Sequence, residues 1–220
     1  MSRAINRATN REKFAMIQRC LRTSAGRPAG LVLAACLAAA LSGCISLGGG
    51  KTPESLLTLT PEAAIPAGAT ATGSASEGLV VLEPETDRRL AVQRLAVSVD
   101  SANVAYMQKA MWVERPARLF RSLLAETIRA QGNRIVFEDS DAGASGRARL
   151  AGRLLDMGYD GPTQSVVVRY DAIMERGAGA ITTKRFEARV DNVAPDAKSV
   201  GPALNRAAND VARQVAEWAR

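Results

Sequence analysis

SVVVRYDAIMERGAGAITTKRFEARV, residues 165–190, is the stretch that decides the fold. Two runs, 165–174 and 181–190, are separated by residues 176–179, whose glycines permit a tight turn. In the second run apolar residues alternate with charged ones, with Phe186, Ala188 and Val190 set against Arg185, Glu187 and Arg189. Because successive side chains of a strand point to opposite faces, this alternation predicts an antiparallel hairpin with one face buried and one face in water.

Shorter apolar runs upstream predict further strands at 55–60, 79–82, 94–99, 134–137 and 148–156. In the run 94–99, the side chains of Leu95, Val97 and Val99 are expected to face the core together, since they lie two residues apart. These runs add short strands to the sheet that the hairpin begins.

Two helices are predicted. The first begins at Pro116, carries an apolar stripe as far as Ile128 and ends at residues 131–133, which tolerate a left-handed backbone. The second runs from about Val200 to Trp218, again with one apolar face. The sequence therefore predicts an α/β fold of the α+β type, a two-layer sandwich with a mostly antiparallel sheet and both helices on one face.

The first 43 residues have the composition of a lipoprotein signal peptide. A basic stretch is followed by an uncharged run at 29–40 and then by small residues. The run is well short of the roughly 20 residues that cross a bilayer. Either Met1 or Met16 is the true start, since Met16 would give a signal of ordinary length.

Most of the chain's positive charge lies in this leader. Seven basic residues and one acidic residue precede Cys44, and they account for +6 of the net charge of +7. The remaining chain is nearly neutral. Because binding to a phosphate backbone needs clustered basic residues, no nucleic-acid partner is expected.

The segment Leu41-Ser42-Gly43-Cys44 resembles the lipobox of bacterial lipoproteins, in which a peptidase recognises Leu41, Ser42 and Gly43 and cleaves before the cysteine. The resemblance implies a diacylglycerol on the Cys44 sulfur and an acyl chain on its freed amine, with no other cofactor. Two or more chains make membrane attachment stable. The alternative is an ordinary secretory signal with an incidental cysteine. Ile45 follows, where an Asp would favour the inner membrane of enterobacteria, so an anchor in the outer membrane facing the periplasm is expected.

Composition also divides the chain after the leader. Residues 44–54 are predicted to form a lipidated, glycine-rich tether, and 55–220 to form one domain. A flexible loop is expected over about 61–78, because this stretch has too few large apolar residues to offset the entropy of ordering it.

The chain contains no histidine. This absence excludes Ser-His and Cys-His nucleophile pairs and zinc sites with histidine ligands. Residues 48–52 lack the leading glycine of a phosphate loop, and the segment from Asp139 lacks the glutamate that closes a calcium loop. Asp156, Asp160 and Asp171 are interpreted as turn and strand-edge residues. The sequence therefore predicts no enzyme activity, no catalytic residue and no metal site.

Short segments behind the cysteine carry a resemblance to a known family, at 57–61, 95–97, 104–107, 111–117 and 204–218. In this order they make the chain similar to the ABC-type transport auxiliary lipoprotein family, the PqiC-like partners of MCE lipid-transport systems. The resemblance implies a non-enzymatic accessory that works with an MCE-domain protein and an ABC permease and ATPase to move lipids between the membranes. The resemblance leaves open whether the protein forms a homo-oligomer.

Tyr106, Met107, Met111 and Trp112 form an amphipathic cluster of residue types that are enriched at protein interfaces. They are predicted to be a partner-binding surface, and the alternative is that they pack in the core beneath the helix. A second function also stays open, that of a structural or regulatory envelope lipoprotein, such as a cell-wall-synthase activator or a partner in the assembly of an outer-membrane barrel.

Overall fold

The computed structural model describes residues 55–74, 77–132, 134–138, 148–177 and 179–220. The predicted leader, lipobox and tether lie outside these residues. The elements are, in chain order, strands β1 Leu79–Val81, β2 Glu85–Thr86, β3 Arg94–Ser98 and β4 Val104–Met111, helix α3 Pro116–Ala130, strands β5 Val136–Glu138, β6 Ala148–Asp160, β7 Ser165–Arg176 and β8 Ala180–Val190, and helix α4 Ala197–Trp218. In the part of the chain that the structure describes, no helix is both long and apolar enough to cross a bilayer.

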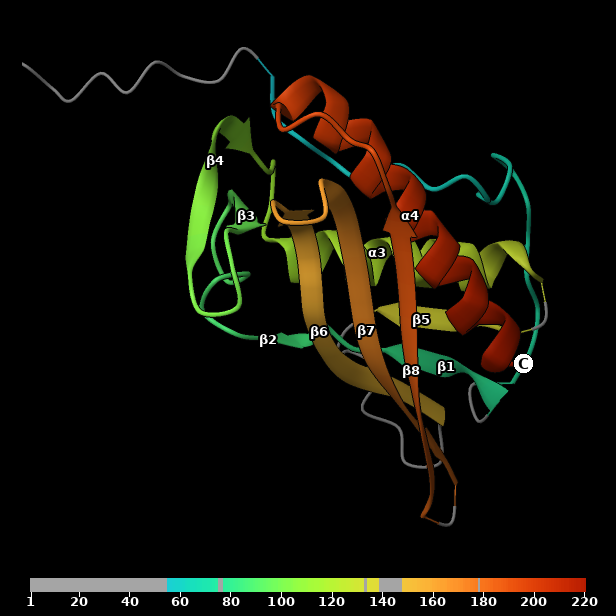
Figure 1. Cartoon of the computed structure of the whole chain (residues 1–220). Helices are drawn as coiled ribbons and strands as arrows, with labels where there is room; N and C mark the ends of the chain where they lie inside the picture. Colours follow the sequence, from blue (N-terminus) through green and yellow to red (C-terminus); the bar gives the residue numbers. More distant parts are fainter. Residues whose placement is uncertain (1–54, 75–76, 133, 139–147, 178) are drawn as a thin grey trace, which may run out of the picture. The chain divides into compact units, whose positions relative to one another are not determined.

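Strand β6 organises the sheet (Figure 1). One edge of β6 pairs in parallel with β1, β2 and β3 in succession, and the other edge pairs antiparallel with β7. The sheet continues from β1 to β5 in parallel, and from β3 to β4 and β7 to β8 antiparallel. The long pairings are therefore antiparallel, as predicted, while the short strands make the sheet a mixed one.

Both helices pack on one face of this sheet and against each other, which confirms the predicted two-layer arrangement. Helix α3 contacts β1 and β5, and α4 contacts β7 and β8 (Figure 1). Phe120 of α3 meets Tyr170 of β7 edge to face, with 5.3 Å between the ring centroids. Phe186 of β8 meets Trp218 of α4 in the same manner at 5.6 Å. These aromatic contacts join each helix to the hairpin that the sequence predicted.

Strand β3 differs from its prediction in the residues that face the core. Leu95 is fully buried, as expected, and Val97 is half-buried, but Val99 is 50% exposed. The prediction for Val99 is wrong because β3 ends at Ser98, and Val99 belongs to the turn that leads to β4. Ala96 is also buried, although it points to the opposite side from Leu95.

The segment 55–60, predicted as a strand, forms a single parallel bridge, from Leu57 to Trp112. The backbone N–H of Leu57 donates to the Met111 carbonyl, and the N–H of Val113 donates to the Leu57 carbonyl. Beyond this bridge the segment leaves the sheet. The prediction of a strand is therefore wrong in its extent.

The chain that follows the bridge runs along the two helices, and we call residues 57–65 the strap. Three backbone N–H groups of the strap donate to helix side chains, Thr60 to Asn205 Oδ1, Glu62 to Asn209 Oδ1 and Ile65 to Glu126 Oε1, each at 2.8 Å. Side chains of the helices thus accept hydrogen bonds from the strap N–H groups, which in a strand would be donated to a neighbouring strand. The expected flexibility of residues 61–78 stays a prediction.

Candidate functional site

The four residues of the predicted partner-binding surface have different surroundings. Trp112 is only 2% exposed and belongs to the core, so the prediction that it contacts a partner is wrong. Met111 is half-buried at the end of β4. Tyr106 and Met107 are also half-buried, and both line an open groove of about 570 Å³. A partner-binding role stays a prediction for these two residues, and the groove is the candidate site.

The groove lies between β4 and the beginning of α4, with walls that are mainly apolar. Ala105, Tyr106 and Met107 come from β4, and Pro195 and Ala197 come from the start of α4. Its volume falls within the range of about 300–1,000 Å³ that is usual for ligand-binding pockets. It is a shallow surface feature, however, and suits a side chain or an extended segment better than an enclosed small molecule.

A bulge in β4 builds one wall of the groove. Tyr106 pairs with Ala96 of β3, and the next paired residue of β4, Met111, pairs with Arg94. Residues 107–110 therefore lie opposite the single residue Leu95. Within the bulge, Lys109 has a φ of 58°, which is uncommon for a residue other than glycine. The bulge thereby places residues 107–109 on the wall that faces α4.

The opposite wall is the capped start of α4. Asp196 accepts hydrogen bonds from the Ser199 backbone N–H at 2.9 Å and from the Ser199 hydroxyl at 3.0 Å. These bonds lower the pKa of Asp196. Because of this cap, α4 begins at Ala197 instead of near Val200. This cap was not predicted, although an Asp three residues before a Ser, directly after Pro195, is a recognisable start signal.

Positive charge gathers around the groove. Lys109 and Lys198 are among its lining residues. The guanidinium of Arg94 lies 4.5 Å from the centroid of the Tyr106 ring, a cation–π contact. The single acidic residue in the lining, Asp196, is engaged by Ser199. The groove therefore combines an apolar floor with a cationic rim.

Basic residues also pair with the acidic residues that the sequence analysis interpreted as structural. Asp156 lies 3.1 Å from Arg89 and 3.3 Å from Arg169, Asp160 lies 3.9 Å from Arg189, and Asp171 lies 2.6 Å from Arg185. Since Arg169 also contacts Glu187 at 2.6 Å, ion pairs link β6, β7 and β8 in a row. Their role is to join strands.

The environments of these carboxylates move their pKa values in two directions. Burial raises the pKa of Asp156 and outweighs the two arginines beside it. The hydrogen bonds from Arg185 lower the pKa of Asp171, and the bond from Arg169 lowers that of Glu187. Among the residues that the structure describes, no three His, Cys, Asp or Glu side chains come together as a metal site would require.

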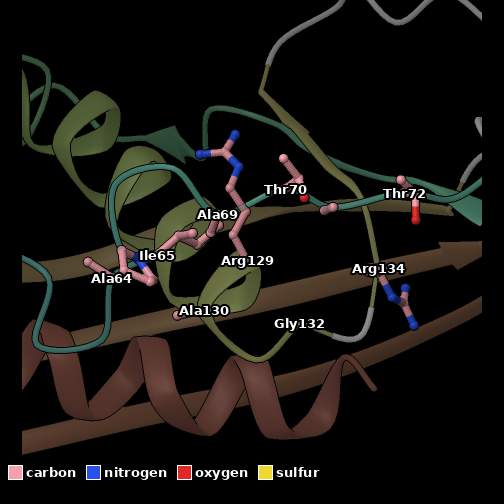
Figure 2. Close-up of a pocket in the computed structure, with 11 residues that line it drawn as sticks. Ala64, Ile65, Ala69, Thr70, Thr72, Arg129, Ala130, Gly132 and Arg134 are labelled. Atoms are coloured by element: carbon pink, nitrogen blue, oxygen red, sulfur yellow. The ribbon is translucent and has the colours of Figure 1, made fainter.

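A second hollow, of about 430 Å³, lies where residues 64–72 pass the end of α3 (Figure 2). Arg129 lines it but is engaged by Glu138 at 3.0 Å. Arg134 also lines it, and burial, followed by the charge of Arg176, lowers the pKa of Arg134. The guanidinium groups of Arg129 and Arg134 point in different directions (Figure 2), so they do not form a joint anion site.

Residues 57–216 match the family described as the ABC-type transport auxiliary lipoprotein component. The chain belongs to this family. The match covers all the described strands and nearly all of α4, so it includes both walls of the groove. No curated protein matches the chain.

Solved structures share the fold of this family member. A Xanthomonas campestris protein of the family DUF330 is 16% identical, with a TM-score of 0.57 over 76% of this chain and 91% of its own. An uncharacterized protein is 10% identical, with a TM-score of 0.59 over 76% of this chain and 100% of its own. A dodecamer of PelC from Paraburkholderia phytofirmans is 13% identical over 64% of this chain and 92% of its own, with a TM-score of 0.34. At these identities, the first two similarities concern the fold alone.

Membership confirms the predicted family. The protein is an auxiliary lipoprotein component of ABC-type transport and is therefore associated with the cell envelope. The predicted lipid attachment site Cys44 and the recognition residues Leu41, Ser42 and Gly43 lie outside the described residues and stay predictions.

Proposed function

We propose that this lipoprotein is anchored in the outer membrane, faces the periplasm and serves an ABC/MCE-type lipid transport system as a non-enzymatic accessory. Membership in the transport auxiliary lipoprotein family carries this proposal. An MCE-domain protein, together with an ABC permease and ATPase, would be its working partners. Copies anchored in the same membrane would also be able to meet and form a homo-oligomer.

The lipobox supports the anchor. Cys44 stands at the end of the predicted leader, and Leu57, the first residue of the strap, follows it by thirteen positions. Such a tether reaches at most roughly 45 Å at about 3.5 Å per residue. The domain would therefore stay near the membrane, where its local concentration is high enough to make weak contacts with a partner effective.

The side chains of the domain support a binding role. The carboxylates Asp156, Asp160 and Asp171 serve cross-strand ion pairs. The chain has no histidine for acid-base chemistry at neutral pH. What the domain offers a partner is instead the groove between β4 and α4, with its apolar floor and cationic rim.

The anchor is tested by Cys44→Ala, which removes the sulfur that would carry the lipid. We expect this variant to fold but to leave the membrane fraction, since the chain loses its acyl chains. Cys20→Ala is the matched control, because this cysteine lies in the leader and should leave both acylation and membrane fractionation unchanged. Mass spectrometry of the mature protein should find an acylated cysteine at its start. Membrane retention of Cys44→Ala, or an unmodified thiol, would contradict the anchor.

The transport role is tested by crosslinking the acylated protein in cells and purifying it. We expect an MCE-domain protein among the crosslinked partners. Recovery of a peptidoglycan synthase or of a barrel-assembly protein, without an MCE-domain protein, would instead support the structural or regulatory function. Density-gradient separation of the two membranes in the same cells tests the outer-membrane location.

A further inference from the structure

The sheet ends in strands that differ in how well their free edges are protected. Among the residues that the structure describes, β8 pairs only with β7, and β5 pairs only with β1. The eleven residues of β8 include the charged Lys184, Arg185, Glu187 and Arg189, and β5 is three residues long. Charges and short length are the usual means by which proteins prevent an edge from pairing with another chain. Both of these edges are thus protected.

Strand β4 is an edge strand that is protected only in part. Among the described residues it pairs only with β3. A bulge is another means of protecting an edge, and the bulge at residues 107–110, with Lys109 in it, interrupts the second half of β4. Val104 and Ala105 are exposed at its beginning, and Val104 is 46% exposed. Residues 104–106 therefore form an unprotected edge, which is a recognised place for pairing with another chain.

The chain itself shows that the outer edge at the end of β4 accepts an added strand. Leu57 forms hydrogen bonds there with the Met111 carbonyl and the Val113 N–H. These two groups point away from β3, since the N–H of Trp112 between them donates in the other direction, to the carbonyl of Gln93 just before β3. This contact occupies only the final part of the edge. Residues 104–106 pair with β3 on one side, and among the described residues no strand pairs with their other side.

The register shows which backbone groups of the free part point outward. The Val99 N–H donates to the Asn103 carbonyl, so these two residues face each other across the start of the ladder. In an antiparallel ladder, inward and outward backbone groups alternate. The backbone groups of Val104 and Tyr106 therefore point away from β3, where an added strand would bond to them.

The groove beside this edge indicates the chemistry of an added strand. Tyr106, Met107 and Pro195 would contact apolar side chains, which in a strand recur at every second position. Lys109 and Lys198 would attract carboxylates, because their two positive charges outnumber the single negative charge of Asp196. Charge complementarity thus favours a partner with acidic residues over a basic one.

We propose that residues 104–106 of β4 bind an extended segment of a partner protein as an additional strand, with its apolar side chains in the groove and its acidic side chains near Lys109 and Lys198. Backbone hydrogen bonds would supply much of the affinity, and the groove would supply the preference for sequence. This site does not depend on which transport system the protein serves.

The test uses the mature, acylated protein in detergent micelles and a phage-displayed library of random twelve-residue peptides as the probe. We expect selected peptides to alternate apolar with acidic residues. Hydrogen exchange of the Val104 and Tyr106 amides should slow by about tenfold or more when such a peptide binds, because these amides become hydrogen-bonded. A selected peptide that is N-methylated at alternate positions should lose its affinity.

Two variants make the test specific. Met107→Lys places a charge beside the free edge and should weaken binding by about tenfold or more. Thr183→Lys places the same charge on the exposed edge of β8, and we expect it to leave affinity within about twofold. The exchange rates of buried amides in β6 and β7 serve to show that both variants are folded.

Three results would overturn the proposal. The first is a selection that enriches no peptide, and the second is a set of peptides whose binding is insensitive to Met107→Lys or protects β8. The third is slower exchange of the Val104 and Tyr106 amides in the absence of peptide. If exchange slows as protein concentration rises, the occupant is a second copy of the chain. If it slows when anionic phospholipid vesicles are added, the occupant is a lipid surface.

Discussion

The side chain of Asn209 in α4 makes three hydrogen bonds, two of them to the strap and one within the helix. Its Oδ1 accepts the N–H of Glu62 at 2.8 Å, and its Nδ2 donates to the carbonyls of Thr60 at 3.0 Å and Asn205 at 2.9 Å. Asn209 is 5% exposed, so water does not readily replace it. Replacing it with alanine would remove all three bonds and leave the two strap groups without their partner.

The magnitude follows from these contacts. Each hydrogen bond contributes about 1 kcal/mol net, and a buried group left without a partner costs about 1–3 kcal/mol. Because the strap lies at the surface, water can reach part of the exposed backbone. We therefore expect Asn209→Ala to lower the free energy of unfolding by about 2–3 kcal/mol. Asn209→Asp keeps the acceptor for Glu62 but loses both donated bonds, and it should have an intermediate effect.

Urea denaturation measures the change in stability, and hydrogen exchange locates it. In Asn209→Ala the amide of Glu62 should exchange much faster, while buried amides of β7 should change only as far as global stability changes. A loss below about 0.5 kcal/mol, the size of an ordinary surface substitution, would refute the reasoning. So would an unchanged exchange rate at Glu62, because the strap would then be held elsewhere.

Two further predictions concern the sheet. Gly152→Ala should lower the free energy of unfolding by about 3 kcal/mol or more. Gly152 has a φ of +153°, and an added Cβ would clash with the Asp171 carbonyl and approach the Tyr170 ring to 2.7 Å. Gly177→Ala is the control in the same denaturation experiment, because there is open space around Gly177. The arginine partners of Asp171 and Glu187 lower the folded pKa of both acids, so the stability they add is present above their unfolded pKa values, near 4, and is lost as pH falls through the folded values. Thermal unfolding at falling pH should therefore show a smaller acid-dependent loss for Asp171→Asn, and an identical loss would count against this ion pair.

The hairpin and the helices could be predicted because their signals are local. The alternation around Phe186 needs only neighbouring residues to define a half-buried strand, and Pro116 marks the first turn of α3, as the structure has it. The end of α3 was also predictable, since Gly132 adopts the left-handed conformation that the sequence suggested. Strand β6 was predicted to end at Asp156 but continues to Asp160, because pairing with β3 and β7 supports residues beyond the alternating run.

The parts that could not be predicted depend on contacts between distant residues. The parallel pairing of β1, β2 and β3 with β6 is one such part, because the apolar pattern of a strand does not specify which other strand it pairs with. The bulge of β4 is another such part, since Lys109 has no sequence preference that marks a left-handed backbone. The candidate surface was accordingly predicted in part. Its residue types identified Tyr106 and Met107, but only the fold shows that Trp112 lies in the core and that the other wall comes from α4.

The strap and the free edge of β4 are parts of one arrangement. Leu57 closes the edge at Met111 and Val113, and the bulge interrupts it at residues 107–110, so an added strand has only residues 104–106 available. At about 3.3 Å per residue this stretch is roughly 10 Å long, which suits a short partner strand. The same strap leads back toward the predicted anchor at Cys44. The segment that follows the predicted lipid anchor thus also limits the size of the site that we propose for a partner strand.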